Sequence, residues 1–164
     1  MELIDVSKFA SPYTITYSPS EQSYKFVTDY DVEYAVSFME DEILDVDEVF
    51  HFIVSNTKRK ASPRDIKVRD TITAILDAFF QQRQSAIIYI CETGDGKQSM
   101  RNRLFHYWFS RYKHSNECMF LSSAVIDEEG VMNYATLVIR NDNPNLTNVL
   151  NSYTTTIQLL SQKP

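Results

Sequence analysis

The chain has 164 residues, of which 43% are hydrophobic and 23% charged, with only three glycines and five prolines. This length suits a single domain with a buried core, and this composition excludes a disordered or low-complexity chain. No apolar run approaches the roughly 20 residues of a membrane span, and no basic segment followed by an apolar one opens the chain, so we expect no membrane association and a cytoplasmic location.

Charge is distributed unevenly along the chain, whose formal net charge is -6. Residues 1–50 contain twelve acids and two bases, whereas residues 58–113 contain twelve bases and five acids. The acidic and basic parts either face each other within the fold or leave a basic surface for an anionic partner. Because nucleic-acid-binding domains are usually basic overall, nucleic acid is a less favoured partner than an anionic ligand or an acidic protein surface.

The first third of the chain alternates aromatic and polar residues with the period of a β-strand. Turn residues at 18–21 and 29–31 separate three such segments, and a run at 49–54 predicts a fourth strand. The acidic connection at 40–48 lacks the glycine and the spacing of a calcium-binding loop, so we expect it to be solvated. For the aromatic residues of this antiparallel meander we favour core packing over stacking on nucleobases, because the acidic surroundings repel phosphates. The alternating residues are Tyr13, Ile15, Tyr17, Tyr24, Phe26, Tyr34, Val36 and Phe38.

Two helices and one strand are predicted in the middle of the chain. Basic residues 58–60 form a surface loop, after which Ser62 as cap and Pro63 at the first helical position begin a helix with one apolar face. An uninterrupted apolar run at 86–91 predicts a strand buried on both faces. Apolar residues between 97 and 112 recur at helical spacing and predict a second helix.

The last part of the chain predicts a hairpin and a final helix. Cys118–Ile126 and residues 131–139 are strands joined by an acidic turn that ends in Gly130, and Asn143 with Pro144 begins the helix. Strands that occur in runs, rather than alternating with helices, indicate an α+β fold. We therefore predict a single domain over residues 1–164: an antiparallel meander followed by α-β-α-β-β-α, with helices packed on a mostly antiparallel sheet. The apolar face of the final helix comprises Leu146, Val149, Leu150, Tyr153, Ile157 and Leu160.

The densest polar stretch follows the buried strand and opens the second helix. Gly94 and Gly96 allow the backbone to approach a ligand, and the unpaired N–H groups and positive dipole at a helix start attract anions. Lys97 and Arg101 share one helix face there, where a cation is unfavourable unless an anion neutralises it. That anion is either a bound ligand or the chain's own acids. The candidate ligand-binding residues are Glu92, Thr93, Gly94, Asp95, Gly96, Lys97 and Arg101.

The same stretch does not match motifs that bind nucleotides or metals. Its glycines are two residues apart and Gln98 follows the lysine, unlike a phosphate-binding P-loop. Glu92 and Asp95 are a candidate pair for acid–base work, but a metal site usually needs several more converging ligands. We therefore expect no metal and no cofactor.

The histidines and cysteines give weaker signals. We expect His51 on the outer face of its strand and His106 on the polar side of the second helix, and no serine-histidine-aspartate pattern is recognisable. Cys91 and Cys118 each lie beside an apolar run, so we expect both to be reduced and buried.

One stretch resembles a known family. It consists of Tyr89-Ile90-Cys91-Glu92-Thr93-Gly94-Asp95-Gly96-Lys97-Gln98, followed by Arg101-Asn102-Arg103-Leu104-Phe105 and Trp108-Phe109. The stretch is similar to a family of small bacterial proteins classed as a domain of unknown function, and the likeness extends over nearly the whole chain. The resemblance implies a small bacterial cytoplasmic protein, and it implies no catalytic residue because no activity is established for that family.

Three functional hypotheses follow. The first is a non-enzymatic binding or adaptor domain for an anionic ligand or protein partner, which would dock at Gly94–Gly96 and the cationic helix start. The second is a hydrolase acting on a phosphorylated or acylated substrate, with Glu92 or Asp95 as base or metal ligand and Arg101 on the developing charge. The third is a homo-oligomer that associates through the last helix or an edge strand.

Overall fold

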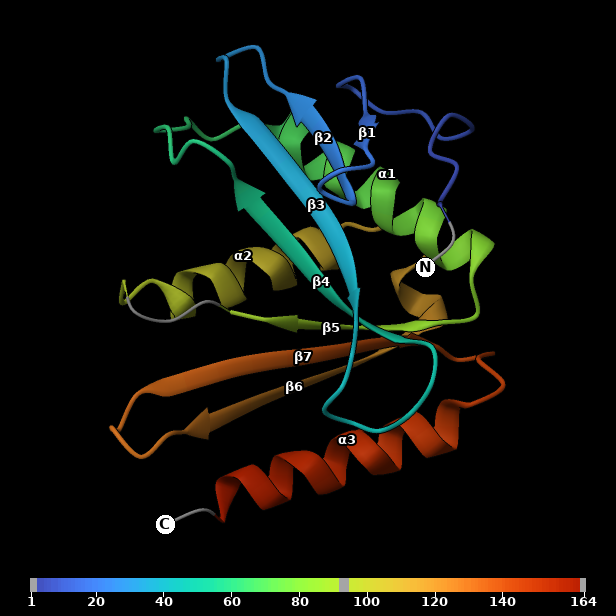
Figure 1. The fold of residues 1–164 in the computed structure, drawn as a ribbon, viewed down its shortest axis with the longest axis vertical. Coiled ribbons are helices and arrows are strands. Elements are labelled where there is room, and N and C mark those ends of the chain that lie inside the picture. Colours follow the sequence, from blue (N-terminus) through green and yellow to red (C-terminus); the bar gives the residue numbers. More distant parts are fainter. Residues whose placement is uncertain (1–2, 92–94, 163–164) are drawn as a thin grey trace. The chain divides into compact units, whose positions relative to one another are not determined.

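A computed structural model describes residues 3–91 and 95–162 (Figure 1). The fold is α+β, as the sequence predicts, and its elements follow the predicted order with one added 3-10 turn. In chain order the elements are β1 (Thr16–Ser18), β2 (Ser23–Val27), β3 (Glu33–Glu40), β4 (Val49–Asn56), α1 (Ile66–Gln82), β5 (Ala86–Ile90), α2 (Gln98–Ser110), η1 (Ser115–Glu117), β6 (Cys118–Ile126), β7 (Met132–Arg140) and α3 (Leu146–Ser161).

The strands form one mostly antiparallel sheet in the order β1-β2-β3-β4-β5-β7-β6. The pairs β1–β2, β2–β3, β5–β7 and β6–β7 are antiparallel. β4 and β5 pair in parallel, with Val49 opposite Ala86, because α1 returns the chain between them as a parallel connection requires. β5 therefore lies inside the sheet: its first three residues are buried, as predicted, but Ile90 at its end is 46% exposed.

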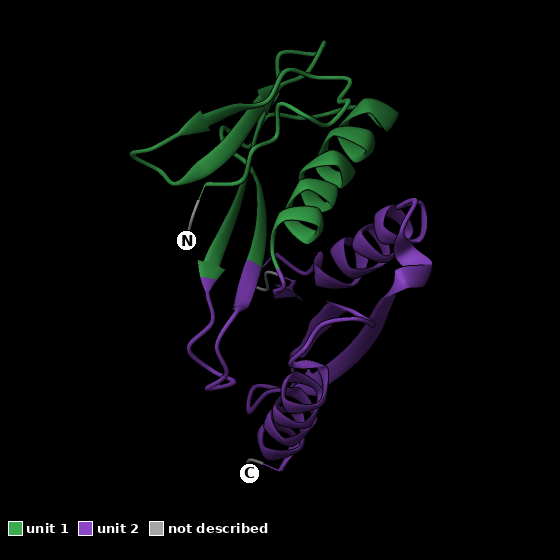
Figure 2. Ribbon diagram, turned by 90° about the vertical axis from the view of Figure 1, so that its right-hand side faces the viewer, with its two compact units in different colours: residues 1–39, 52–83 green, residues 40–51, 84–164 purple. Residues whose placement is uncertain are grey.

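The chain divides into two compact units, which are described separately (Figure 2). Unit 1 comprises residues 1–39 and 52–83, and unit 2 comprises residues 40–51 and 84–164. The expectation of a single domain over residues 1–164 stays a prediction.

Unit 1 has an aromatic core between its strands and α1. Phe38 of β3 stacks on Phe79 of α1 with ring centroids 4.5 Å apart, and Tyr13 stacks on Phe26 at 5.9 Å. The alternation in the first third of the chain thus serves core packing, except at Tyr17, which is 37% exposed. The first predicted strand was too long, however, because β1 comprises only Thr16–Ser18. Tyr13 instead lies in the connection before β1, where its hydroxyl donates a hydrogen bond to Asp65.

Helix α1 begins later than predicted. Its cap is Asp65, whose carboxylate accepts a hydrogen bond from the backbone N–H of Lys67 at 3.0 Å, whereas Ser62 donates its hydroxyl hydrogen to the carbonyl of Pro63 and caps nothing. Asp65 satisfies one of the free N–H groups of the first turn, so the helix starts at Ile66. The three bases at 58–60 are exposed, as predicted, and the core-facing side of the helix begins with the buried residue Val68.

Unit 2 contains β5, β7 and β6 with a helix on each face (Figure 1). Phe120 of β6 lies against Phe109 of α2 at 5.1 Å between ring centroids, whereas the hydroxyl of Tyr153 in α3 hydrogen-bonds to Ser123 Oγ at 3.1 Å. Successive strand residues point to opposite faces, so α2 and α3 cover opposite sides of the hairpin. The apolar cluster beneath α3 comprises Leu44, Val49, Ala86, Ile88, Leu137, Ile139, Val149 and Tyr153.

The acidic connection at 40–48 contains a buried corner, so its description as simply solvated was wrong. The side chain of Asp41 is fully covered and lies 2.6 Å from Nε2 of His51, and it accepts the backbone N–H of Leu44 at 2.7 Å. The side chain of His51 is 20% exposed. This corner places Leu44 in the cluster beneath α3, where its carbonyl accepts the hydroxyl hydrogen of Ser152.

Candidate functional site

The structure describes four of the seven predicted ligand-binding residues, and these lie together at the start of α2. Asp95, Gly96 and Lys97 precede the helix, and Arg101 lies in its first turns. Gly96 has a φ of 72°, a left-handed conformation that glycine adopts without strain. The other three, Glu92–Gly94 in the sequence, lie outside the described residues.

Asp95 and Arg101 form a bidentate ion pair. Nη1 of Arg101 donates to Oδ1 of Asp95 at 2.9 Å, and Nη2 donates to Oδ2. Oδ1 also accepts the backbone N–H of Lys97 at 3.0 Å. The guanidinium and this N–H hold the pKa of Asp95 well below its ordinary value of 3.8. The sequence left two sources for the anion that neutralises Arg101: a bound ligand or the chain's own acids. In the structure the guanidinium pairs with the chain's own carboxylate, that of Asp95.

Helix α2 begins without a side-chain cap from any residue that the structure describes. Lys97 is the cap residue, and its side chain makes no capping hydrogen bond. Among the described residues, the N–H groups of the first turn beyond Lys97 therefore have no carboxylate or hydroxyl cap. This end of α2 is attached to the sheet because Nε2 of Gln98 donates to the carbonyl of Met132 at 3.2 Å.

Cys91 and Cys118 are free thiols, as expected. Cys91 is buried, but Cys118 is only half-buried, which corrects the prediction for that residue. Burial raises the pKa of each thiol to about 11, so neither is an activated nucleophile near neutral pH.

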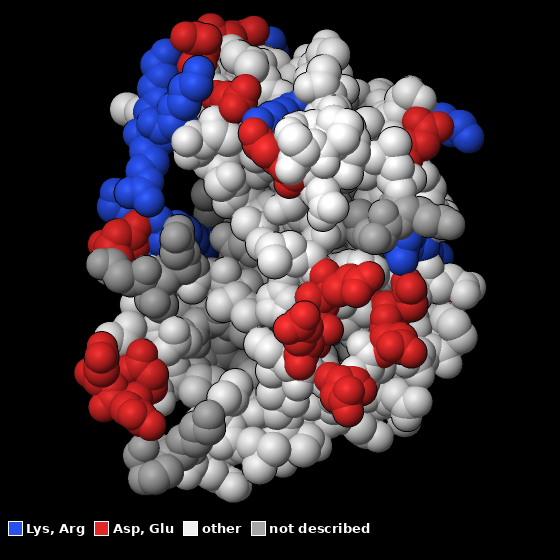
Figure 3. All heavy atoms as spheres, viewed as in Figure 1, with Lys and Arg blue, Asp and Glu red and all other residues white. Residues whose placement is uncertain are grey.

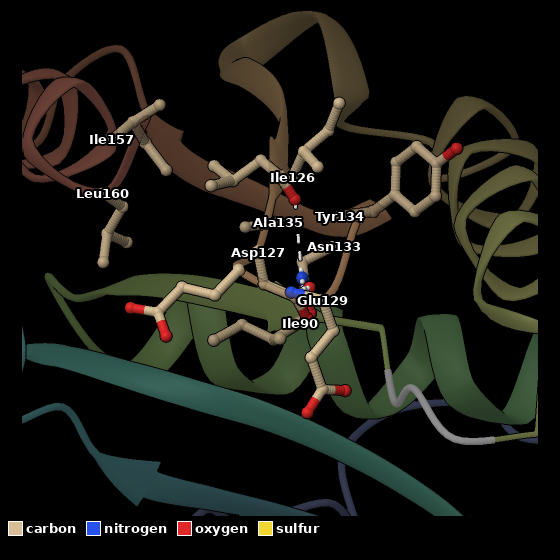
Figure 4. A pocket seen from close by; sticks show the side chains of 11 residues that line it. Ile90, Ile126, Asp127, Glu129, Asn133, Tyr134, Ala135, Ile157 and Leu160 are labelled. Atoms are coloured by element: carbon tan, nitrogen blue, oxygen red, sulfur yellow. Dashed lines mark hydrogen bonds between the residues drawn. The ribbon is translucent and has the colours of Figure 1, made fainter. Parts of the chain in front are cut away.

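A pocket of about 580 Å³ opens beside the end of β5 (Figure 4). Ile157 and Leu160 of α3 line one side of it, and Ile90 of β5 lines another. Leu160 belongs to the same apolar face of α3 as the buried Tyr153, but it is 38% exposed. The apolar face of α3 therefore extends beyond the part of the helix that packs on the sheet. The pocket is lined by Ile90, Val125, Ile126, Asp127, Glu128, Glu129, Asn133, Tyr134, Ala135, Ile157 and Leu160.

The hairpin turn at one side of this pocket is acidic. The carboxylate of Asp127 is engaged within the turn, where the N–H of Val131, the amide of Asn133 and the N–H of Glu129 lower its pKa. Glu128 and Glu129 are exposed. On the face drawn in Figure 3, acidic side chains gather over this turn and over the 40–48 connection, both in unit 2.

His106 faces the sheet, so its predicted place on the polar side of α2 was wrong. Its Nε2 lies 2.7 Å from Oγ of Ser122, and Ser122 Oγ lies 3.0 Å from Oγ1 of Thr136. Burial lowers the pKa of His106, which favours a neutral imidazole that accepts the serine hydrogen. Among the described residues no carboxylate hydrogen-bonds to this ring, so the group that orients the histidine of a catalytic triad is not part of the cluster.

The chain is similar to a known family. A model of a family of unknown function, DUF6169, matches residues 64–155, which is more than half of the chain. The chain belongs to the DUF6169 family. Within this DUF6169 protein the matched residues run from just before α1 into α3, so they include the ion pair at the start of α2 and most of the pocket lining, but not β1 to β4. No curated protein and no solved structure matches the chain.

Two kinds of feature are absent from residues 3–91 and 95–162. No group of three or more His, Cys, Asp or Glu side chains within that part of the chain could hold a metal ion. No helix there is both long and apolar enough to cross a membrane.

Proposed function

We propose that this DUF6169 protein is a non-enzymatic binding domain whose ligand has an apolar body and a positively charged group. The observation that carries the proposal is the pocket at the end of β5, where Ile90, Ile157 and Leu160 surround a hollow of about 580 Å³. Ligand pockets typically have this size and a mostly apolar lining with few polar groups. Apolar side chains left exposed around such a hollow gain free energy when a ligand covers them.

The charge of the ligand follows from the hairpin turn. Glu128 and Glu129 line the pocket and are exposed, and Asp127 adds a third negative charge. A cationic group at the mouth of the pocket would lie near these carboxylates, whereas an anionic group would be repelled by them. The pocket therefore suits an amine or guanidinium attached to an apolar segment, such as a lysine or arginine side chain beside an aliphatic one.

The hydrolase hypothesis has weaker support than the binding hypothesis. Asp95, its described candidate base, has a lowered pKa and is held by Arg101 in a bidentate pair, and general bases work best when their pKa lies near the working pH. The described pocket lining contains no histidine, cysteine, serine or lysine. These features favour binding without chemistry.

The pocket is tested with hexyltrimethylammonium as a probe, followed by chemical-shift changes of backbone amides. We expect the largest shifts at residues that line the pocket, and about fivefold to tenfold weaker binding in Leu160→Ser, which removes an apolar contact worth about 1 kcal/mol. The matched control is Leu159→Ser, because Leu159 is 61% exposed and does not line the pocket.

The charge preference is tested with hexanesulfonate, which carries the same alkyl chain with a negative group. We expect weaker binding of hexanesulfonate than of the ammonium probe, and the difference should shrink in the double variant Glu128→Gln, Glu129→Gln. If Leu160→Ser binds the probes as tightly as Leu159→Ser does, the proposed binding site is contradicted. If the unaltered chain binds hexanesulfonate as tightly as hexyltrimethylammonium, the proposed preference for a positive charge is contradicted.

A second candidate, an anion bound at the start of α2, is favoured by one observation. Within residues 3–91 and 95–162 no side chain caps the first turn of α2, and Lys97 lies beside it. In this alternative a phosphate or carboxylate of the ligand or partner replaces the Asp95 carboxylate on Arg101 and accepts N–H groups of the helix. Glu92, Thr93 and Gly94 complete the proposed set from the sequence.

If the Asp95–Arg101 pair is structural, removing it should lower the melting temperature. We expect Arg101→Ala to lower the melting temperature by about 1–3 °C at pH 7, because the pair is part-exposed. The lowered pKa of Asp95 means that this stabilisation is present above pH 3.8 and is lost as the pH falls further, so the difference should shrink in acid. Arg103→Ala is the control, because Arg103 is exposed on the same helix.

Inorganic phosphate distinguishes an anion site from a purely structural pair. If an anion binds, phosphate raises the melting temperature, the rise is larger in Asp95→Asn because Arg101 is released, and it is lost in Lys97→Ala. A melting temperature that phosphate leaves unchanged in all of these variants contradicts the second candidate.

We also infer a bacterial origin and a cytoplasmic location. The resemblance of the 89–109 stretch to small bacterial proteins supports the origin. Two free thiols in a chain without a disulfide between them suit a reducing compartment.

A further inference from the structure

β6 is the last strand of the sheet, and hydrogen bonds at its two ends show which of its backbone groups face outward. Before β6, the N–H of Asn141 donates to the carbonyl of Glu117 at 2.9 Å, and after it the N–H of Asp127 donates to the carbonyl of Val131 at 3.0 Å. Both bonds continue the β6–β7 register, in which Ser122 lies opposite Thr136. Hydrogen-bonded and non-hydrogen-bonded pairs alternate along an antiparallel ladder, so the odd-numbered residues of β6 bond to β7.

The even-numbered residues of β6 therefore direct their N–H and C=O groups away from β7. The N–H of Cys118 is engaged by the carbonyl of Ser115 in η1. Phe120, Ser122, Ala124 and Ile126 make no backbone hydrogen bond on this outer side to any residue in the part of the chain that the structure describes. The result is an open row of donors and acceptors along a nine-residue strand.

The strand also lacks the features by which edge strands usually prevent pairing. Its sequence, CMFLSSAVI, contains no charged residue, no proline and no glycine. Natural edge strands are commonly protected by a lysine, a proline, a bulge or shortness. The unbroken register from Cys118 to Ile126 shows that β6 contains no bulge.

We propose that β6 pairs with β6 of a second copy of the chain, antiparallel and about a two-fold axis at Ser122. This residue is the centre of the strand, so the pairing places Ser122 opposite its own copy, Phe120 opposite Ala124, and Cys118 opposite Ile126. All of these are even-numbered residues, so the outward groups of each copy face those of the other and can exchange hydrogen bonds. The two sheets become one continuous sheet.

The side chains of β6 fit a copy of the same strand. Large residues meet small ones on both faces, since Leu121 lies opposite Ser123 and Phe120 opposite Ala124, and no charged residue is brought opposite a like charge. These features favour a second copy over an unrelated peptide, for which the uncharged edge offers no selectivity.

The first experiment measures mass by analytical ultracentrifugation. At micromolar concentrations we expect a measured mass of twice the 19.1 kDa of one chain. Ala124→Pro should sediment as a monomer, because the N–H of Ala124 faces outward and proline removes it without breaking the β6–β7 ladder. The matched control Ala124→Thr keeps the N–H and should remain a dimer.

The second experiment fixes the register and does not depend on the folding of the proline variant. Hydrogen-bonded antiparallel partners have Cα atoms about 5.5 Å apart, within the range of a disulfide. In a Cys118→Ser background, oxidised Ser122→Cys should therefore give a cross-linked dimer, whereas Ala124→Cys, opposite Phe120, should not. Sedimentation of the unaltered chain as a monomer, or equal cross-linking of the two cysteine variants, would overturn the proposal. A peptide that binds this edge of a monomeric chain would overturn it as well.

Discussion

Phe105→Ala is expected to lower the free energy of unfolding by about 3–5 kcal/mol, the usual range for removing a buried phenylalanine. Phe105 is 1% exposed and joins α2 to the sheet: its ring stacks on Tyr89 of β5 at 4.1 Å and on Phe120 of β6 at 6.2 Å. Alanine would leave a cavity between three elements that the surrounding aromatic rings cannot close without moving α2. Urea denaturation followed by circular dichroism measures the loss.

The neighbouring residue provides the control. Leu104 is also an apolar residue of α2 but is 47% exposed, so Leu104→Ala should cost less than about 1 kcal/mol. Phe105→Leu should cost less than Phe105→Ala because most of the volume is kept. Equal losses for Leu104→Ala and Phe105→Ala would mean that α2 does not pack on the sheet through Phe105.

The contrast between Leu104 and Phe105 also shows how far periodicity predicts a fold. Apolar residues at helical spacing correctly indicated that α2 exists, but the apolar set spans more of the helix than the sheet covers. The apolar face of α3 was predicted residue by residue, because a stripe of six residues is wide enough to specify one side. Even there, the pattern could not show that Val149 and Tyr153 would be buried and Leu160 left at an open pocket.

Long-range polar partners were the main features that the sequence did not reveal. His106 was placed on the polar side of α2 because its neighbours in the helix are polar, yet Ser122 and Thr136 on two strands provide it with hydrogen-bond partners at the sheet. A polar side chain is tolerated at a half-buried position when distant residues satisfy it. Local sequence gives no sign of such partners.

The same limit applies to the candidate site. The start of α2 could be predicted because its glycines, bases and strand exit are neighbours in the sequence. The pocket could not, because its lining comes from the end of β5, the β6–β7 hairpin and the last turns of α3, which only the fold brings together. The one local signal was the apolar stripe of α3, whose last residues extend beyond the part covered by the sheet.

Asp41→Ala is expected to lower the free energy of unfolding by about 2–4 kcal/mol, although Asp41 lies in a connection that the sequence suggested was merely solvated. Its side chain is fully covered, and its carboxylate accepts the N–H groups of Leu44 at 2.7 Å and Ile43 at 3.2 Å as well as facing His51. Alanine would leave these groups without a partner, which costs more than the net gain from each bond. Thermal and urea denaturation measure the loss.

Three further variants separate the buried corner from the general effect of removing an acid. Asp47 lies in the same connection and is exposed, so Asp47→Ala should change the free energy of unfolding by less than about 0.5 kcal/mol. His51→Ala removes the partner of Asp41, and the double variant Asp41→Ala, His51→Ala should lose less than the sum of the two single losses because the two side chains interact directly. Additive losses, or a loss for Asp41→Ala no larger than for Asp47→Ala, would mean that the corner does not hold Leu44 and the connection in place beneath α3.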